Sequence, residues 1–286
     1  MLRKPGSITG VGIVQFFLAA TFVVWLLFFP DTGVNFAWPV KPRLAAMFIG
    51  TSFILRVFLG YHLWREQYWY RLRWIVWGNY MFLAVIFLAT FWHLDQMNWK
   101  SNIWVAHIWV VAYVVEPLTL VLIEPHDAES KAPIPAEVSE GPISIWLKRM
   151  LAAIFVLGVT VAGLLLINPA FANTRWPWSL DPFDARIMAA WPAACAVWAA
   201  TMYFRNDWAE IKMGVQTLVV YTTALFVVWL VTLSQYDPAR KNIVTFGVVT
   251  GVAAALLIFF YWRQEASRRN TQVHDRPGLR DQAQQV

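Results

Sequence analysis

Long apolar stretches separated by short polar segments run along the whole sequence. Eight of them approach the length of about 20 apolar residues that a helix needs to cross a bilayer. They are Thr9–Pro30, Arg43–Leu63, Trp74–His93, Asn102–Ile123, Ile145–Asn168, Arg186–Phe204, Met213–Gln235 and Asn242–Trp262. The runs are continuous and lack the two-residue alternation of a membrane barrel, so they predict helices. We expect an all-α integral membrane protein with about eight transmembrane helices.

Composition agrees with this prediction. Hydrophobic residues make up 59% of the chain and charged residues 14%, against about 25% charged residues in a typical soluble domain. The net charge of +6 comes from basic residues scattered over many loops, which argues against a nucleic-acid partner. The first apolar run has no small-residue cleavage site, so it is interpreted as an anchor. The expected partner is the lipid bilayer.

The basic residues also predict an orientation. An even number of spans puts both termini on one side, and 15 of the 23 Lys and Arg residues fall on that side, while seven fall on the opposite side and Arg56 lies within a span. Cytoplasmic loops carry the basic excess in membrane proteins. We therefore expect a multi-pass protein of the cell membrane with both termini in the cytoplasm.

The two halves of the chain share an order of landmarks. In the first half, a span ends at Pro30, the loop contains Trp38-Pro39, and Arg43 opens the next span. In the second half the same landmarks are Pro169, Trp176-Pro177 and Arg186. Four spans per unit give both copies the same direction, as in a parallel duplication. The predicted units are residues 1–123 and 144–262, two four-helix repeats. Residues 124–143 are then a flexible cytoplasmic linker, and residues 263–286 a polar cytoplasmic tail.

Tryptophan is abundant, with 18 residues. Ten lie near the ends of predicted helices, which is typical of an aromatic belt at the lipid headgroups. These ten are Trp38, Trp64, Trp69, Trp99, Trp104, Trp146, Trp176, Trp178, Trp208 and Trp262.

Four polar residues of the first half are predicted to share one layer inside the membrane. Counted from the outer ends of their helices at about 1.5 Å per residue, all four lie roughly 20 Å deep. They are Gln15, Arg56, Asn79 and Glu116. An Arg56–Glu116 pair that only joins two helices would be structural. A cavity open to the cytoplasm that binds a polar solute, or relays protons through Glu116, would be functional.

The loop after the fifth span is the most distinctive local sequence. Its prolines and indoles predict a rigid segment at the membrane surface, with Asp184 capping the following helix. The alternative is an outer binding lip. The lip hypothesis names Trp176, Trp178, Asp181 and Arg186.

Other chemistry has weaker support. The lone cysteine, Cys195, excludes an internal disulfide and a multi-cysteine metal site, and no metal ligands are proposed. His93 and His107 are the only candidate pair of haem ligands, and their differing depths make haem unfavoured. No phosphate-binding loop, zinc motif or nucleophile elbow occurs, so nothing specifies an enzyme.

Three functions remain open. The first is a membrane protein that binds or transports a small polar solute. The second is a structural or assembly subunit of a larger membrane complex, and the third is a redox protein that binds haem or a quinone. The parallel duplication and the polar layer favour solute binding or transport. The second half has no matching polar layer, although a transport pathway usually needs both halves, and this favours a structural or assembly subunit.

Overall fold

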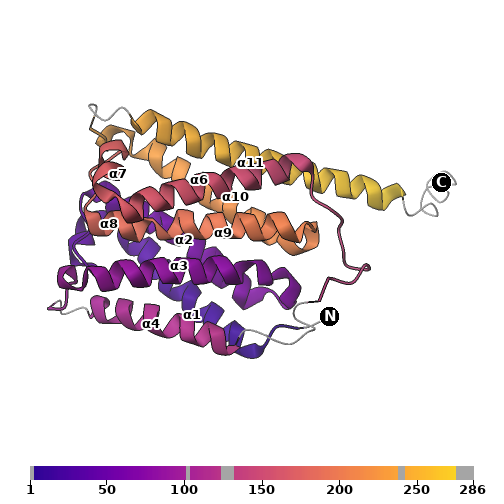
Figure 1. The fold of residues 1–286 in the computed structure, drawn as a ribbon, viewed down its shortest axis with the longest axis horizontal. Coiled ribbons are helices and arrows are strands. Elements are labelled where there is room, and N and C mark those ends of the chain that lie inside the picture. The colour runs from indigo at the N-terminus through magenta and orange to yellow at the C-terminus, as the bar shows by residue number, and fades with distance from the viewer. Residues whose placement is uncertain (1–2, 101–103, 124–131, 238–241, 275–286) are drawn as a thin grey trace.

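The computed structural model describes residues 3–100, 104–123, 132–237 and 242–274, with side chains as far as residue 268. The described chain is a bundle of long helices running roughly side by side (Figure 1). Its first half contains α1 (Gly6–Val23), η1 (Val24–Phe28), η2 (Pro30–Asn35), α2 (Arg43–Arg65), η3 (Trp69–Arg71), α3 (Arg73–Trp92), η4 (Leu94–Gln96) and α4 (Val105–Ile123). Its second half contains α6 (Ile145–Ile167), α7 (Pro169–Arg175), α8 (Pro182–Met188), α9 (Ala190–Arg205), α10 (Trp208–Val231), η5 (Leu233–Gln235) and α11 (Asn242–His274).

Within the described residues, eight helices are long and apolar enough to cross a membrane. They match the eight predicted spans, which confirms an all-helical chain of the multi-pass type. Two spans begin four or five residues earlier than predicted. The sixth starts at Pro182 because Asp181 caps α8, and the seventh starts at Trp208 because Asp207 accepts a hydrogen bond from the N–H of Ala209.

The spans differ in how deeply they are buried. In α2, 78% of an apolar stretch of 18 residues is buried inside the protein, compared with 17% in α6. The interior of the bundle consists of α2 and α9, with α3 against α9 and α10 against α2. At the outside, α1 packs on α2, α6 on α9, α4 on α3 and α11 on α10. The exposed apolar faces of α4, α6 and α11 are suited to contact with lipid.

Glycine allows the closest helix contacts. A Cβ atom on Gly12 would lie 2.5 Å from the backbone nitrogen of Trp64, and one on Gly158 would lie 2.6 Å from the carbonyl oxygen of Pro192. These distances are shorter than any side chain tolerates, so α1 and α2, and likewise α6 and α9, meet backbone to backbone.

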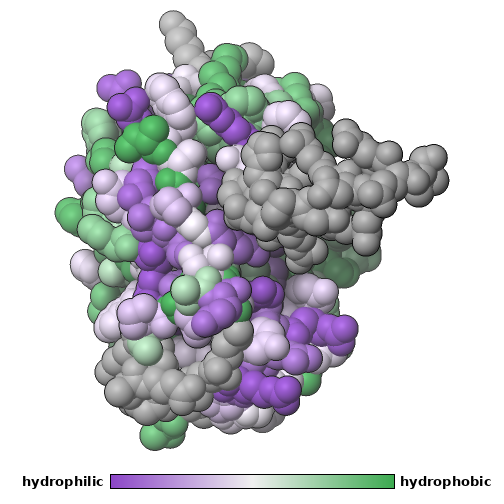
Figure 2. Space-filling model, turned by 90° about the vertical axis from the view of Figure 1, so that its right-hand side faces the viewer, coloured by the Kyte–Doolittle hydropathy of each residue, from purple (hydrophilic) through white to green (hydrophobic). Residues whose placement is uncertain are grey.

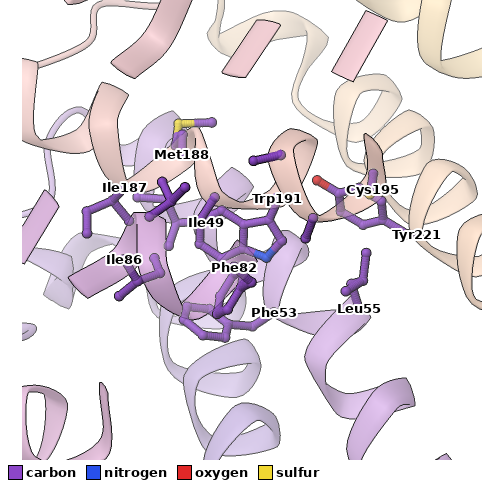
Figure 3. Packing of buried hydrophobic residues seen from close by; sticks show 14 of the residues in the cluster. Ile49, Phe53, Leu55, Phe82, Ile86, Ile187, Met188, Trp191, Cys195 and Tyr221 are labelled. Carbon is purple, nitrogen blue, oxygen red and sulfur yellow. The ribbon is translucent and has the colours of Figure 1, made fainter. Parts of the chain in front are cut away.

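Aromatic side chains fill the interior. Trp191 packs edge-to-face on Phe53 at 5.3 Å and on Phe82 at 5.4 Å between ring centroids, and Figure 3 shows the three rings at the centre of the cluster. The predicted aromatic belt is therefore wrong for part of its members. Trp38, Trp69, Trp178 and Trp208 are buried in the protein, whereas Trp99, Trp104, Trp146 and Trp262 are exposed.

In Figure 1, α1 begins and α11 ends at the same end of the bundle. Figure 2 faces this end and shows polar side chains gathered on it, beside apolar ones at the rim. The described part of the predicted linker makes contacts here. The backbone N–H of Trp208 donates to the Gly141 carbonyl at 3.0 Å, and the Gln264 side chain donates to the Pro142 carbonyl at 3.3 Å.

Candidate functional site

The structure brings together the four polar residues predicted to share a layer, and we call them the polar centre: Gln15, Arg56, Asn79 and Glu116. The Arg56 guanidinium donates one hydrogen bond to the Asn79 amide oxygen and another to the Glu116 carboxylate. Gln15 donates its amide N–H to the backbone carbonyl of Arg56 at 3.3 Å. One residue comes from each of α1, α2, α3 and α4, so the polar centre connects all four helices of the first half.

Burial makes these contacts necessary. The Arg56 side chain is 3% exposed and Glu116 is 18% exposed, and a buried charge without a partner is strongly unfavourable. The face of the Phe82 ring lies 4.7 Å from the guanidinium carbon, which adds a cation–π contact. Pro117 follows Glu116 inside α4 and cannot donate to the preceding turn, which favours a local bend.

Gln15 leaves one polar atom without a partner. Only its NH2 group can donate to the Arg56 carbonyl, so the amide oxygen Oε1 points away from that bond. This oxygen is buried and has no hydrogen-bond partner among the described residues. A buried acceptor in this state costs about 1–3 kcal/mol, so the position favours a ligand or water that can donate a hydrogen bond.

The polar centre opens onto a long groove between α1 and α4, which we call the α1–α4 groove. It encloses about 950 Å³, and both Gln15 and Glu116 lie in its wall. Most of its other lining residues are apolar, and two of them, Val14 and Val111, are more than half exposed. The groove therefore opens along the side of the bundle between α1 and α4.

A second, much smaller space lies on the other side of the polar centre. It encloses about 30 Å³ next to Asn79, bounded by Ile8 and Leu63. That is room for about one water molecule. It extends from Asn79 toward the end of the bundle where α1 begins.

A second buried ion pair was not predicted from the sequence. Arg73, at the start of α3, donates to both carboxylate oxygens of Glu210 near the start of α10, at 3.0 and 2.5 Å. Arg205 lies 3.7 Å from the same carboxylate. Arg73 and Glu210 both fall outside the predicted spans, because each lies within a few residues of a helix end. Glu210, an acidic residue three positions before an apolar run, was the available signal.

The residues of the predicted outer lip have structural contacts. Asp181 is the cap of α8 and accepts the Phe183 N–H at 2.8 Å. Arg186 donates to the Leu166 carbonyl at 3.3 Å and covers the ring of Trp92. Trp176 and Trp178 line a cavity of about 200 Å³ between α2 and the helices of the second half.

The prediction that Asp184 caps this helix is wrong. Asp184 lies within α8, is 1% exposed and accepts a hydrogen bond from the Trp38 indole at 2.7 Å. The cap is Asp181, three residues earlier, because helix α8 begins at Pro182. Asp184 instead ties the outer loop of the first half to the second half.

The two candidate haem ligands have separate surroundings. The Arg186 guanidinium lies 2.7 Å from His93 Nε2, and the Gln96 amide lies 3.1 Å from Nδ1. Both ring nitrogens of His93 therefore already have protein partners. His107 packs between the rings of Trp99 and Trp104 and lines the α1–α4 groove.

Within the described residues, the eight long apolar helices are consistent with a polytopic, all-helical membrane protein. No known protein-family model, curated protein or solved structure matches this chain.

Proposed function

We propose that this protein lies in the cell membrane with both termini in the cytoplasm. We also propose that it binds, as a carrier or receptor, a small amphipathic molecule bearing a hydrogen-bond donor in the α1–α4 groove. The observation that carries this function is the unpartnered Oε1 of Gln15, buried in the wall of a groove that also contains Glu116. The apolar lining would hold the hydrocarbon part of the ligand, and the polar centre would hold its polar end.

The ligand is expected to be amphipathic rather than fully polar. The groove wall is mostly apolar, with four valines, Leu18, Ile108, Ala112 and Trp104 among its lining residues, so a polar solute would lose its water without gaining partners along most of the groove. A molecule already dissolved in the bilayer loses little on entering. Its N–H or O–H group would meet the Glu116 carboxylate, and it would reach the buried Gln15 Oε1 after a rotation of the Gln15 side chain toward the groove.

The proposed two-repeat architecture is supported by how the helices pair. In the first half α1 packs on α2 and α3 on α4, and in the second half α6 packs on α9 and α10 on α11. Between the halves, α2 meets α10 and α3 meets α9. Exchanging the two halves leaves this set of pairs unchanged, as a two-fold axis along the membrane normal would require.

The test uses the full chain in lipid nanodiscs with two cationic probes of equal chain length. Dodecylamine has an ammonium with N–H donors, and dodecyltrimethylammonium has the same charge without donors. We expect dodecylamine to bind at least about tenfold more tightly, which corresponds to about 1.4 kcal/mol. Gln15→Leu should reduce this preference, because only the Glu116 carboxylate then accepts from the ammonium.

Thr119→Val is the matched control. Thr119 lines the same groove, but its hydroxyl already donates to the Val115 carbonyl at 2.9 Å, so its loss should leave the preference unchanged. Equal binding of the two probes by the unmodified protein would refute a donor-specific site. A second membrane polypeptide that co-purifies in a fixed ratio and blocks both probes would replace this function with that of an assembly subunit.

A further inference from the structure

A cavity lined mainly by the second half of the chain is not used by the proposed function. It encloses about 200 Å³ between α2, α6, α9, α10 and α11, and we call it the second-half cavity. Leu157 and Val249 line it and are each more than 40% exposed. It therefore reaches the lipid-facing surface between α6 and α11, and a molecule dissolved in the bilayer can enter it there.

Most hydroxyl groups around the second-half cavity are already used. Thr222 donates to the Leu218 carbonyl at 2.8 Å, and Thr250 donates to the Phe246 carbonyl at 2.9 Å. A water molecule needs two to four polar partners to occupy a cavity, and apolar cavities of about 150 Å³ stay dry and bind benzene. The cavity is therefore suited to an apolar occupant.

One hydrogen-bond donor remains available. Ser52 Oγ and Tyr221 Oη lie 3.4 Å apart as each other's hydrogen-bond partner, and both line the cavity. The two hydroxyls carry two hydrogens, and their mutual bond uses one. Whichever oxygen donates, one O–H is left to donate to a ligand. Figure 3 shows Tyr221 beside Cys195 at one end of the buried cluster.

Aromatic rings form the wall nearest the loop after α7. Trp178 is stacked on Phe48, with centroids 4.3 Å apart and planes at 21°, and Trp176 meets Trp178 edge-on at 5.5 Å. Flat aromatic surfaces gain most from contact with another flat ring.

From these features we infer that the second-half cavity binds a flat apolar ring compound carrying a carbonyl acceptor, of the quinone class. The ring lies against the aromatic wall, and the carbonyl accepts the spare O–H of the Ser52–Tyr221 pair. This site does not depend on the α1–α4 groove.

The experiment compares 2,3-dimethyl-1,4-naphthoquinone with 2,3-dimethylnaphthalene, which has the same rings and no carbonyl. Binding to the full chain in nanodiscs is measured from the ligand-dependent rise in unfolding temperature. We expect the quinone to bind about three- to tenfold more tightly, the effect of one hydrogen bond. Ser52→Ala and Tyr221→Phe each leave one O–H, so each alone should keep the preference, and the double variant should lose it.

Ala253→Leu, which adds bulk inside the cavity, should weaken both compounds at least about tenfold. Val252→Leu, on the exposed face of the same helix, is the matched control and should leave both unchanged. Equal affinity for the two compounds in the unmodified protein would overturn the carbonyl contact. Unchanged binding in Ala253→Leu would overturn the site itself.

Discussion

The two four-helix regions pair their helices in the same way and fill the space between them differently. Residues 1–123 place a charged cluster there, with Arg56 and Glu116 in contact. Residues 144–262, together with Phe48 and Ser52 of α2, surround an apolar cavity, and Leu218 of α10 lies in its wall. None of the described residues that line this cavity is charged, so the second region packs its helices there without an ion pair.

This difference bears on whether the polar centre is needed for the packing of the helices or for function. Buried ion pairs are weak evidence for stability, because desolvation offsets most of their attraction. Close glycine contacts hold α1 to α2 and α6 to α9 in both regions. The polar centre is therefore better explained as a site that recognises something than as the element that stabilises the bundle.

The largest effect is expected from breaking the polar centre. Glu116→Gln removes the charge partner of the buried Arg56, and losing one partner of a buried pair costs about 3–5 kcal/mol. Because Glu116 is partly exposed, the lower end of this range is expected. Unfolding of the purified protein in detergent measures the change.

A double variant distinguishes a pair from two separate residues. Arg56→Met with Glu116→Leu makes the first region apolar, as the second already is, and should recover most of the stability lost in Glu116→Gln. The free-energy losses of Arg56→Met and Glu116→Leu alone are also measured. If they simply add up to the loss in the double variant, Arg56 and Glu116 do not depend on each other. The contrast between a charged pair in one region and an apolar cavity in the other would then say nothing about function.

The sequence predicts the spans and the polar centre well because both follow from strong, local rules. A charge in hydrocarbon is rare, so Arg56 and Glu116 stand out, and counting residues from the helix ends gives their depth. Arg73 and Glu210 escape the same reasoning because each lies within a few residues of a helix start. At that depth the sequence does not distinguish a buried ion pair from solvated charges.

Other features depend on three-dimensional packing. Trp38 and Trp178 were predicted at the headgroups because they lie near helix ends, yet the loops that carry them fold inward against Phe183 and Phe48. The groove and the cavity are also beyond sequence reasoning. Their walls come from helices far apart in the chain, and apolar residues that line a void resemble those that fill a core.

An intermediate effect is expected where the two regions resemble each other. Gly158→Ala brings a methyl group into the backbone of α9, and overpacking of this kind costs about 1–3 kcal/mol; Gly12→Ala should cost a similar amount between α1 and α2. Gly163 and Gly10 have no neighbouring atom within 4 Å of an added Cβ. Their change to alanine, in the same two helices, should be neutral or stabilising, and thermal unfolding in detergent measures all four. A destabilising effect at Gly163 as large as that at Gly158 would argue against close helix contact as the cause.

The smallest effect is expected at the outer contact between the two regions. Burial and then the Arg186 guanidinium lower the pKa of His93 below its usual value of 6.5. Below pH about 6.5 the unfolded chain therefore binds more protons at this residue than the folded chain does, and stability falls as the pH is lowered through that window. Protonation of His93 removes its contact with Arg186. We therefore expect the unfolding temperature to drop on the order of 2 °C between pH 7.5 and 5.5. For a chain of this size, that drop corresponds to a loss of less than about 1 kcal/mol in the free energy of unfolding. His93→Gln keeps an acceptor for Arg186 and does not titrate, so this part of the drop should disappear in the variant. The same drop in both proteins would place the titrating group elsewhere.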